Sequence, residues 1–409
     1  MIESPSVVGV AGAPRVPFRF SVAAAGSIHP IRHAIIGATA LWLATRVILV
    51  LWSIVVQLNS PVGTDLFSHR DWLATLFFRW DSLYFAGIAE HGYFGAASLA
   101  TWPAFFPGYP AATRIVAAIL GGTGPSTSLV SVSMSVVVMG ASLVATVLFW
   151  LLVQQRSGSR IALAATVLFV AGPYSLFLVA SYSEALFLVF ALGAWLLAGR
   201  GYWLPAGILA AGASLTRANG MFLIVALVVL YVIHRRSVGA PYFARAAALA
   251  ALGFCGVGGY FLYLFARTGD PQAWTHAEYL GWQRAVRPPS ETLWNTVDLA
   301  LNSHYLATRQ QSTIEIVFAA LFIVALVVLI QRRMWAEATL LGITLVSLMT
   351  STTYMSLART SVVLFPLPIL LATTLLARRQ HWIYWTAVIV GCALLLFNTR
   401  QFALGLWSD

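Results

Sequence analysis

The chain has few charges for its length, and it uses them unevenly. Only 9% of its 409 residues are charged, and all 24 basic residues are arginine, so lysine is absent from the sequence. Hydrophobic residues make up 60% of the chain, well above the apolar share of a soluble domain. These proportions exclude an ordinary soluble globular protein and indicate a polytopic membrane protein.

Cysteine and clustered metal ligands are also scarce. The two cysteines, Cys255 and Cys392, lie inside apolar runs, which excludes a disulfide framework and predicts buried packing residues. The segments expected outside the membrane contain no Asp-x-Asp, and their histidines lack ligand spacing with acids. We therefore predict chemistry that needs neither a metal ion nor a cofactor, only a donor substrate.

The net charge of +11 raises the question of a nucleic-acid partner. The arginines sit in short groups between apolar runs, however, and membrane topology explains that arrangement first. We therefore expect membrane lipids around the chain and no nucleic acid. The sequence leaves the oligomeric state open.

Apolar runs near the length needed for one crossing, about 20 residues, predict an all-α fold with about eleven transmembrane helices. The domain plan is a cytoplasmic tail at 1–33, a transmembrane domain at 34–399 and a short outer tail at 400–409. Two outer loops are long, at 59–126 and 268–312. The expected spans lie near 34–58, 127–153, 161–180, 184–199, 202–216, 219–234, 244–267, 313–331, 335–350, 361–377 and 382–399.

Basic and acidic residues alternate between the two sides of these spans. If the N-terminal tail is cytoplasmic, every other basic loop is cytoplasmic too, as the positive-inside rule requires. The arginines of those loops are Arg156, Arg160, Arg200, Arg235, Arg236, Arg332, Arg333, Arg378 and Arg379. Of the 13 acids, all but Glu3 and Glu337 fall on the opposite side. We therefore expect the chemistry on the extracytoplasmic face.

The first outer loop carries an amphipathic pattern. Apolar residues from Trp72 to Ile88 recur at three-and-four spacing, which predicts a helix over 70–90 lying in the membrane interface and ending at Gly92. A second interfacial helix is expected over 110–121, begun by proline. The helical phase places Asp81 at the edge of the apolar stripe, where lipid headgroups meet water.

Several stretches of the chain resemble one family. They are RWDSLYFAGIAEHGY at 79–93 followed by AFFPGYP, GPYSLFLVASYSEALF at 172–187, SLTRANG at 214–220, GDPQAWTHAEYLGW at 269–282 and RTSVVLFPL at 359–367. The first is the most specific, and the others support it in the same order along the chain. Together they resemble the GPI mannosyltransferase II (PIG-V) family.

The resemblance implies a membrane glycosyltransferase of the GT-C fold. It would move mannose from a polyprenyl-phosphate mannose donor to a lipid-linked or cell-envelope acceptor hydroxyl on the outer face. The exclusive use of arginine is typical of a GC-rich genome, so we expect an actinobacterial-like member in a bacterial plasma membrane. The acceptor, the linkage and the identity of the sugar stay open at this point.

A sugar hydroxyl is a poor nucleophile, and one placed carboxylate acting as general base contributes about 10²–10⁴-fold in rate. Inverting transfer needs that base on one face of the sugar and cations at the phosphate on the other, without the paired carboxylates of a glycosidase. Asp81 is the predicted base. The competing interpretation is an interfacial acid in a surface ion pair with Arg70 or Arg79.

Other polar and aromatic residues of these stretches are candidates for substrate binding. Arg217 and Arg359 suit a phosphate and Glu184 a sugar hydroxyl, although Glu184 and Arg217 also suit a structural pair. The acid and histidine after Asp81 also fit a polar helix end, and the aromatics also fit interface anchors. The full set of predicted binding residues is Arg79, Trp80, Glu90, His91, Tyr109, Glu184, Arg217, His276 and Arg359.

Two other classes of protein compete with an enzyme. A transporter or flippase of a lipid-linked sugar would use intramembrane charges such as Arg46 to mark a path, with a broken helix at Gly172-Pro173. Repeated halves, typical of such transporters, are not visible in the sequence, and Arg46 is expected to be a structural counter-ion. A scaffold would explain neither the outer acids nor the first motif.

Overall fold

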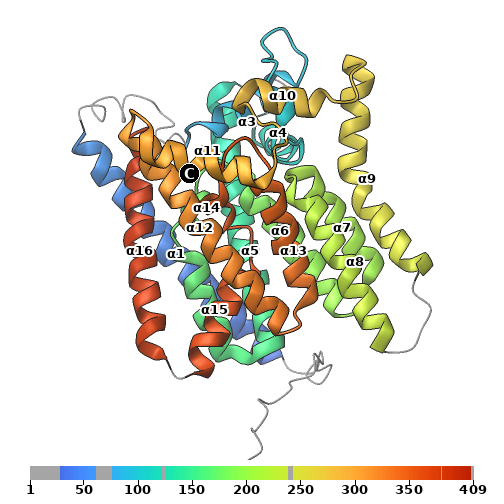
Figure 1. Cartoon of the computed structure of the whole chain (residues 1–409), viewed down its shortest axis with the longest axis vertical. Helices are drawn as coiled ribbons and strands as arrows, with labels where there is room; N and C mark the ends of the chain where they lie inside the picture. The colour runs from blue at the N-terminus through green and yellow to red at the C-terminus, as the bar shows by residue number, and fades with distance from the viewer. Residues whose placement is uncertain (1–27, 61–75, 122–125, 238–242, 379, 407–409) are drawn as a thin grey trace, which may run out of the picture.

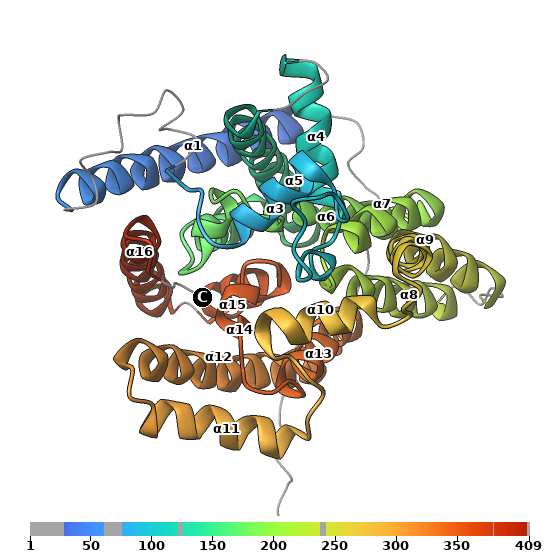
Figure 2. The same ribbon diagram turned by 90° about the horizontal axis from the view of Figure 1, so that it is seen from above.

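A computed structural model describes residues 28–60, 76–121, 126–237, 243–378 and 380–406. All regular elements within these ranges are helical, and most stand side by side as one bundle (Figure 1). Shorter helices cover one end of the bundle. Seen from above, α3, α10 and α14 lie around its middle (Figure 2).

The helices follow the predicted order closely. Their bounds are α1 (Ile28–Leu58), α3 (Asp81–His91), α4 (Gly108–Gly121), α5 (Thr127–Val170), α6 (Glu184–Gly199), α7 (Trp203–Thr216), α8 (Asn219–Ser237), α9 (Phe243–Thr268), α10 (Ala273–Trp282), α11 (Pro289–Asn302), α12 (Leu306–Gln331), α13 (Trp335–Met349), α14 (Leu357–Thr360), α15 (Pro366–Ala377) and α16 (His381–Ala403). Two 3-10 turns, η2 (Trp102–Ala104) and η3 (Ser175–Leu178), lie between them.

Each predicted span overlaps one of these helices. Among the described residues, six helices are long and apolar enough to cross a membrane, and α6, α7, α13 and α15 are shorter apolar helices. The long helix α5 contains a non-helical Gly158 (φ 80°, ψ 168°), so the two spans predicted there are its two arms. A polytopic membrane protein is therefore supported, while the number of crossings stays a prediction.

Two predicted span boundaries are wrong. The helix expected over 161–180 ends at Val170, because Pro173 has no N–H to donate and disfavours helical backbone before it. The chain continues as η3, and the Pro173 carbonyl accepts a hydrogen bond from Asn398 at 2.9 Å. The span expected over 361–377 begins at Pro366, the first-turn position that proline favours.

The first outer loop also differs from its predicted form. The described part of the helix expected over 70–90 begins at Asp81, since residues 76–80 form a turn, and 61–75 lie outside the described residues. Trp80 has a φ of 53°, which a helix interior does not allow. The predicted end at Gly92 is confirmed by its φ of 72°, and α4 confirms the second predicted helix.

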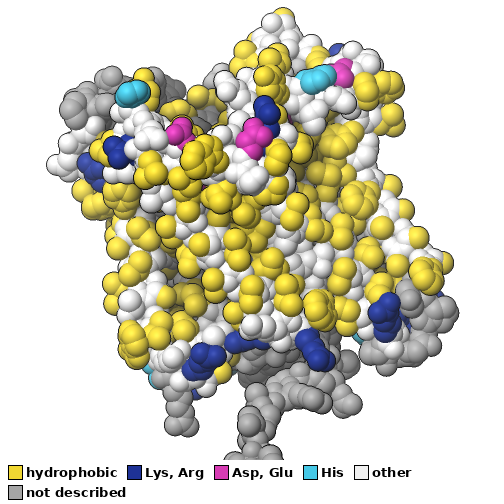
Figure 3. Space-filling view, viewed as in Figure 1, with side chains coloured by type: hydrophobic (Ala, Val, Ile, Leu, Met, Phe, Trp, Pro, Cys, Tyr) yellow, Lys and Arg dark blue, Asp and Glu magenta, His cyan; other side chains and the backbone are white. Residues whose placement is uncertain are grey.

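Polar groups separate to the two ends of the molecule. In this view, acids appear only at one end, together with arginines and histidines; arginines also line the other end, and a hydrophobic band lies between the two ends (Figure 3). The helices α3, α4, α10, α11 and α14 lie at the acidic end. Cys255 is exposed on α9, beside the exposed Phe254, and Cys392 is half-buried on α16, so their predicted burial is wrong.

Candidate active site

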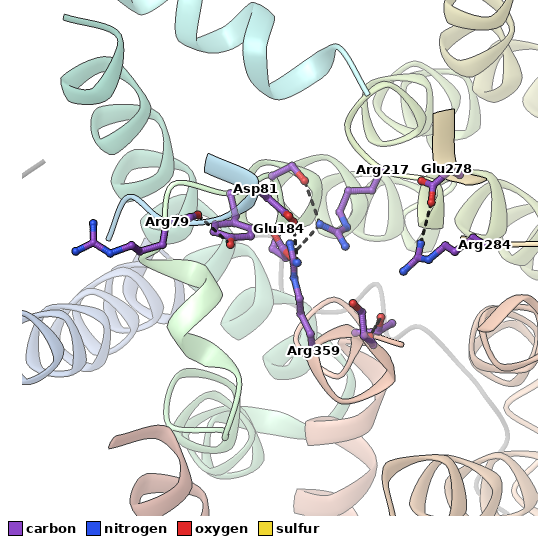
Figure 4. A network of polar contacts seen from close by, with 11 residues as sticks. Arg79, Asp81, Glu184, Arg217, Glu278, Arg284 and Arg359 are labelled. Atoms are coloured by element: carbon purple, nitrogen blue, oxygen red, sulfur yellow. Dashed lines mark hydrogen bonds and ion pairs between the residues drawn. The ribbon is translucent and has the colours of Figure 1, made fainter. Parts of the chain in front are cut away.

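Four charged side chains form one chain of alternating ion pairs at the acidic end. Arg359 donates through Nη1 to Oδ2 of Asp81 at 2.8 Å and through Nε to Oε1 of Glu184 at 2.6 Å. Nη1 of Arg217 lies 2.9 Å from the same Glu184 oxygen. The residues come from α3, α6, α14 and the α7–α8 turn (Figure 4). Two acids and two arginines balance, so the network is electrically neutral.

A cavity of about 200 Å³ lies against this network. Its charged lining consists of Asp81, Glu278, Arg217, Arg284 and Arg359. Glu184 is fully buried behind the wall and does not line the cavity. It therefore holds two of the arginines that line the cavity.

The backbone before α3 aims Asp81 at the cavity. Trp80 adopts φ 53° and ψ −114°, a conformation that costs a non-glycine residue about 1–3 kcal/mol and persists only where neighbours impose it. The preceding residues are held by the segment after η3: the Tyr182 hydroxyl donates to the Arg79 carbonyl at 3.1 Å, and the Ser181 N–H donates to the Phe77 carbonyl at 3.2 Å. Strain of this kind is typical of functional sites.

Arg359 is positioned from two sides. Oε2 of Glu315, a fully buried acid on α12, accepts hydrogen bonds from the N–H groups of Leu357 at 2.8 Å and Ala358 at 3.3 Å, which anchors the start of α14. The guanidinium then lies 4.6 Å from the ring centre of Phe177 and 4.5 Å from that of Tyr182. Arginine suits this place because its planar group stacks on rings while its edges donate.

Arg217 lies in an extended turn between α7 and α8 that depends on close backbone contacts. A Cβ at Gly220 would lie 2.3 Å from the Ser214 nitrogen, so only glycine fits there. A Cβ at Gly108 would lie 2.8 Å from the Leu215 carbonyl oxygen, so the start of α4 also requires glycine. The motifs SLTRANG and AFFPGYP thus pack against each other, and Arg217 donates to the Ser183 hydroxyl at 3.1 Å.

The AFFPGYP loop is held by hydrogen bonds to its carbonyl groups. The Tyr260 hydroxyl lies 2.8 Å from the oxygen of Pro103, the residue before the motif, and the Trp274 indole donates to the Ala104 oxygen at 3.2 Å. The Phe105 oxygen accepts from Tyr93 at 2.7 Å. These bonds join the two long outer loops to α9, so the aromatic side of the cavity is rigid.

The second outer loop adds a carboxylate that the sequence reasoning did not identify. Glu278 on α10 lies 3.3 Å from Arg284, and both side chains line the cavity. Burial raises the pKa of Glu278, Arg284 opposes that shift, and the negative charge of Asp81 adds to it. The spacing of Trp274, Glu278 and Trp282 four residues apart was the available signal for one helix face.

Three residues predicted beside Asp81 lie away from the cavity. The Arg79 guanidinium donates to the Phe78 carbonyl at 3.0 Å and points away from the network (Figure 4), so the ion pair proposed between Arg79 and Asp81 is wrong; Arg70 lies outside the described residues. The Glu90 carboxylate accepts from the Thr127 hydroxyl at 3.2 Å. His91 lies 3.9 Å from Glu90 at the helix end, which fits the structural interpretation of that pair.

The other predicted residues divide between core and surface. Trp80 is 37% exposed and is absent from the cavity lining. Tyr109 is fully buried, its hydroxyl donates to the Met134 carbonyl at 3.0 Å, and burial raises its pKa far above the ordinary tyrosine value. His276 is exposed and pairs with Asp270 at 2.7 Å. Arg46 lies 3.5 Å from the Leu178 carbonyl of η3, which supports its structural role.

Metal ligands do not gather within the described part of the chain. No group of three or more His, Cys, Asp or Glu side chains there could hold a metal ion. The prediction of metal-independent chemistry is not tested by this observation. The charged groups at the cavity are suited to binding an anion through Arg217 and Arg359 and to accepting a proton at Asp81.

Residues 53–237 match the family described as Mannosyltransferase (PIG-V). The matched range includes Asp81, Glu184 and Arg217, and it ends before Glu278 and Arg359. Comparisons with curated proteins and with solved structures gave no match. The family match supports a glycosyltransferase that transfers mannose, and the apolar helices support a membrane protein.

Proposed function

We propose that this membrane mannosyltransferase takes its sugar from polyprenyl-phosphate mannose and transfers it, with inversion, to a hydroxyl of a lipid-linked or cell-envelope acceptor. The observation that carries the proposal is the cavity where Asp81 faces Arg217 and Arg359. A base and two cations around one space are what inverting transfer from a phosphate requires.

In the proposed reaction, the acceptor oxygen attacks C1 of the sugar on the face opposite the phosphate. The new C1–O bond forms as the bond from C1 to the phosphate oxygen breaks. Asp81 takes the proton of the acceptor hydroxyl, and polyprenyl phosphate leaves with the bonding electron pair. Arg217 and Arg359 stabilise the negative charge that develops on the leaving phosphate.

Arg359 links the two halves of this reaction. It donates to Oδ2 of Asp81 at 2.8 Å, a charge-assisted hydrogen bond that engages one oxygen of the proposed base. A donor phosphate competes for the same N–H groups. When Arg359 turns toward the phosphate, Oδ2 of Asp81 loses this donor and can accept from the acceptor hydroxyl instead, so donor binding prepares the base for the acceptor.

A second hollow supports a lipid-linked substrate. It measures about 450 Å³ and is lined mainly by apolar side chains of α3, α4, α7 and α9, among them Ile88, Leu215 and Tyr263. Arg114 is a charged residue at this hollow. A prenyl chain would bury apolar surface there at about 25 cal/mol per Å².

Purified protein in lipid vesicles tests the proposal directly. Polyprenyl-phosphate mannose labelled in the sugar is supplied together with a membrane lipid extract. We expect label to appear in a new glycolipid or envelope glycan. Movement of the labelled donor between leaflets without a new product would instead support a transporter or flippase and overturn the proposal.

The position of the cavity within the fold supports a reaction on the outer face of the membrane, which we propose to be a bacterial plasma membrane. The helices α3 and α10, which contribute to the cavity lining, lie at the end of the molecule opposite the arginine-bearing loops, and such loops are cytoplasmic by the positive-inside rule. We therefore expect the protein to consume donor that is supplied only outside sealed, right-side-out vesicles. Consumption restricted to donor supplied inside would reverse this orientation.

A further inference from the structure

One face of α10 presents a tryptophan, an acid and a second tryptophan to the cavity. Trp274, Glu278 and Trp282 are spaced four residues apart, and all three line the cavity. Residues at that spacing lie above one another on a helix. Ala273 and Ala277, on another side of α10, are buried. The helix is therefore oriented with its chemically active side chains toward the space beside Asp81.

We propose that Trp274, Glu278, Trp282 and Arg284 form a subsite that binds a sugar ring. This inference rests on the proposed glycosyl transfer and assigns the part of the cavity that holds the carbohydrate. A pyranose has apolar C–H faces and a rim of hydroxyls that both donate and accept. Aromatic faces pack against the former, while a carboxylate accepts from and a guanidinium donates to the latter.

Both aromatic side chains are in contact with neighbouring groups of the protein. The Trp274 indole donates to the Ala104 carbonyl at 3.2 Å. Trp282 lies edge-on to Phe105, with ring centres 5.4 Å apart, and is 6.0 Å from Tyr84. A ring held in this way loses little conformational entropy on binding, which favours affinity for a rigid, flat ligand.

The polar pair retains capacity for a ligand. Glu278 and Arg284 are 3.3 Å apart, longer than the 2.6 and 2.8 Å contacts of Arg359 and longer than a strong charge-assisted hydrogen bond. Glu278 is only 14% exposed while Arg284 is 34% exposed. Figure 4 shows this pair beside Arg217 and apart from the Asp81–Glu184 network. Hydroxyls that insert between the two groups would satisfy both.

The sugar ring has two sources, the mannose of the donor and the head group of the acceptor. Two lipids separate them: polyprenyl-phosphate mannose, and polyprenyl phosphate without sugar. Their binding to the purified full-length protein is measured by calorimetry. Saturation of transfer is measured separately with a membrane glycolipid extract that the parental protein labels. Glu278→Gln keeps the shape of the acid, and Trp282→Ala removes one ring.

If the subsite holds the donor sugar, both variants should bind the sugar-bearing lipid about tenfold or more weakly and the sugarless lipid like the parent. If it holds the acceptor, both lipids should bind like the parent and the KM for the glycolipid extract should rise by a similar factor. Glu291→Gln and Trp294→Ala, exposed residues of α11, are matched controls that should change neither quantity.

Two results overturn the inference in different ways. If both variants bind the lipids and show a KM like the parent, the subsite assignment is wrong while the proposed glycosyl transfer still stands. An equal loss for both lipids would show a structural or phosphate-binding role instead. A parental protein that transfers no sugar and does not distinguish the two lipids would overturn the proposed function itself, and the subsite with it.

Discussion

Arg359 and Asp81 are 278 positions apart in the chain, yet Nη1 of Arg359 lies 2.8 Å from Oδ2 of Asp81. The same guanidinium holds the fully buried Glu184. One arginine therefore pairs with an acid at the cavity and an acid in the core, and Arg217 supplies the second positive charge. Changes to Asp81 and to Arg359 should have separable effects, the first mainly on turnover and the second also on stability.

Asp81→Asn should lower turnover by about 100-fold or more, because the amide keeps the size of the acid and cannot take the proton of the acceptor. Donor binding should survive. Asp81→Glu should restore little activity, since a displacement of about an ångström can cost about 10²-fold. Single-turnover transfer by purified protein is the measurement. As a control, Asp298→Asn changes an exposed acid on α11 that pairs with Asn302, and this variant should retain activity. Near-parental turnover in Asp81→Asn would contradict the role of Asp81 as general base.

Arg359→Ala should destabilise the fold by about 3–5 kcal/mol, because removing one member of a buried ion pair leaves the other without full compensation. The free energy of unfolding in detergent, measured with denaturant, tests this. Arg287 is about half exposed and pairs with Glu291 at 3.4 Å, so Arg287→Ala should cost at most about 1 kcal/mol. Equal stability of the two variants would contradict a central structural role for Arg359.

Arg217→Lys should weaken donor use while the protein stays folded, since lysine keeps the charge but loses the planar fork that binds Glu184 and a phosphate together. The donor concentration that half-saturates transfer is expected to rise, and to rise further in Arg217→Ala. Arg200→Lys, an exposed change at the arginine-bearing end, serves as the control. Unchanged donor saturation in Arg217→Ala would remove this residue from the phosphate site.

The pKa of Glu278 is raised by burial, so folding favours its neutral form. This contribution to stability should be complete below the ordinary glutamate pKa and disappear as the pH rises through the raised value. Thermal unfolding measured across this pH range should show the decline in stability, and Glu278→Gln should abolish the decline. A Glu278→Gln variant that kept the same decline would contradict the assignment.

Asp270 supplies a comparison of opposite sign. Its backbone contact with Gln272 and its contact with His276 lower the pKa of this carboxyl. The stability it contributes should be present above the ordinary aspartate pKa and be lost as the pH falls through the folded value. Asp270→Asn should therefore reduce the loss of stability at acid pH. If this variant instead changed the stability over the pH range assigned to Glu278, the assignment to Asp270 would be wrong.

Cysteine labelling tests the orientation in the membrane. In a Cys255→Ser, Cys392→Ser background, Ser290→Cys on α11 should react with an impermeant reagent added to sealed cells. Ser157→Cys, between the arms of α5, should react only after the membrane is opened. Both positions are exposed in the fold, so accessibility in the protein is matched. Labelling of Ser157→Cys in sealed cells would reverse the orientation.

Local chemistry made much of the architecture predictable. Long apolar runs separated by arginines predicted the helices. Gly92 predicted the end of α3 correctly, whereas α4 begins at Gly108, two residues before the predicted start at Pro110. Failures occurred where a single backbone feature outweighed periodicity. The apolar stripe continues through residue 80, yet Trp80 at φ 53° prevents a helix there, because contacts from Tyr182 and Ser181 hold the preceding residues in another conformation.

The sequence by itself determined that this protein is a helical membrane protein, and its motif at 79–93 singled out Asp81 as the acid to examine. Tertiary structure decided which partners that acid has. The ion-pair partner of Asp81 is Arg359 and not the predicted Arg79. Glu278 of the second outer loop lines the same cavity. Periodicity reports only which residues share a face of one helix, whereas an ion pair requires two side chains to meet within 4 Å, and only the packing of separate helices brings that about.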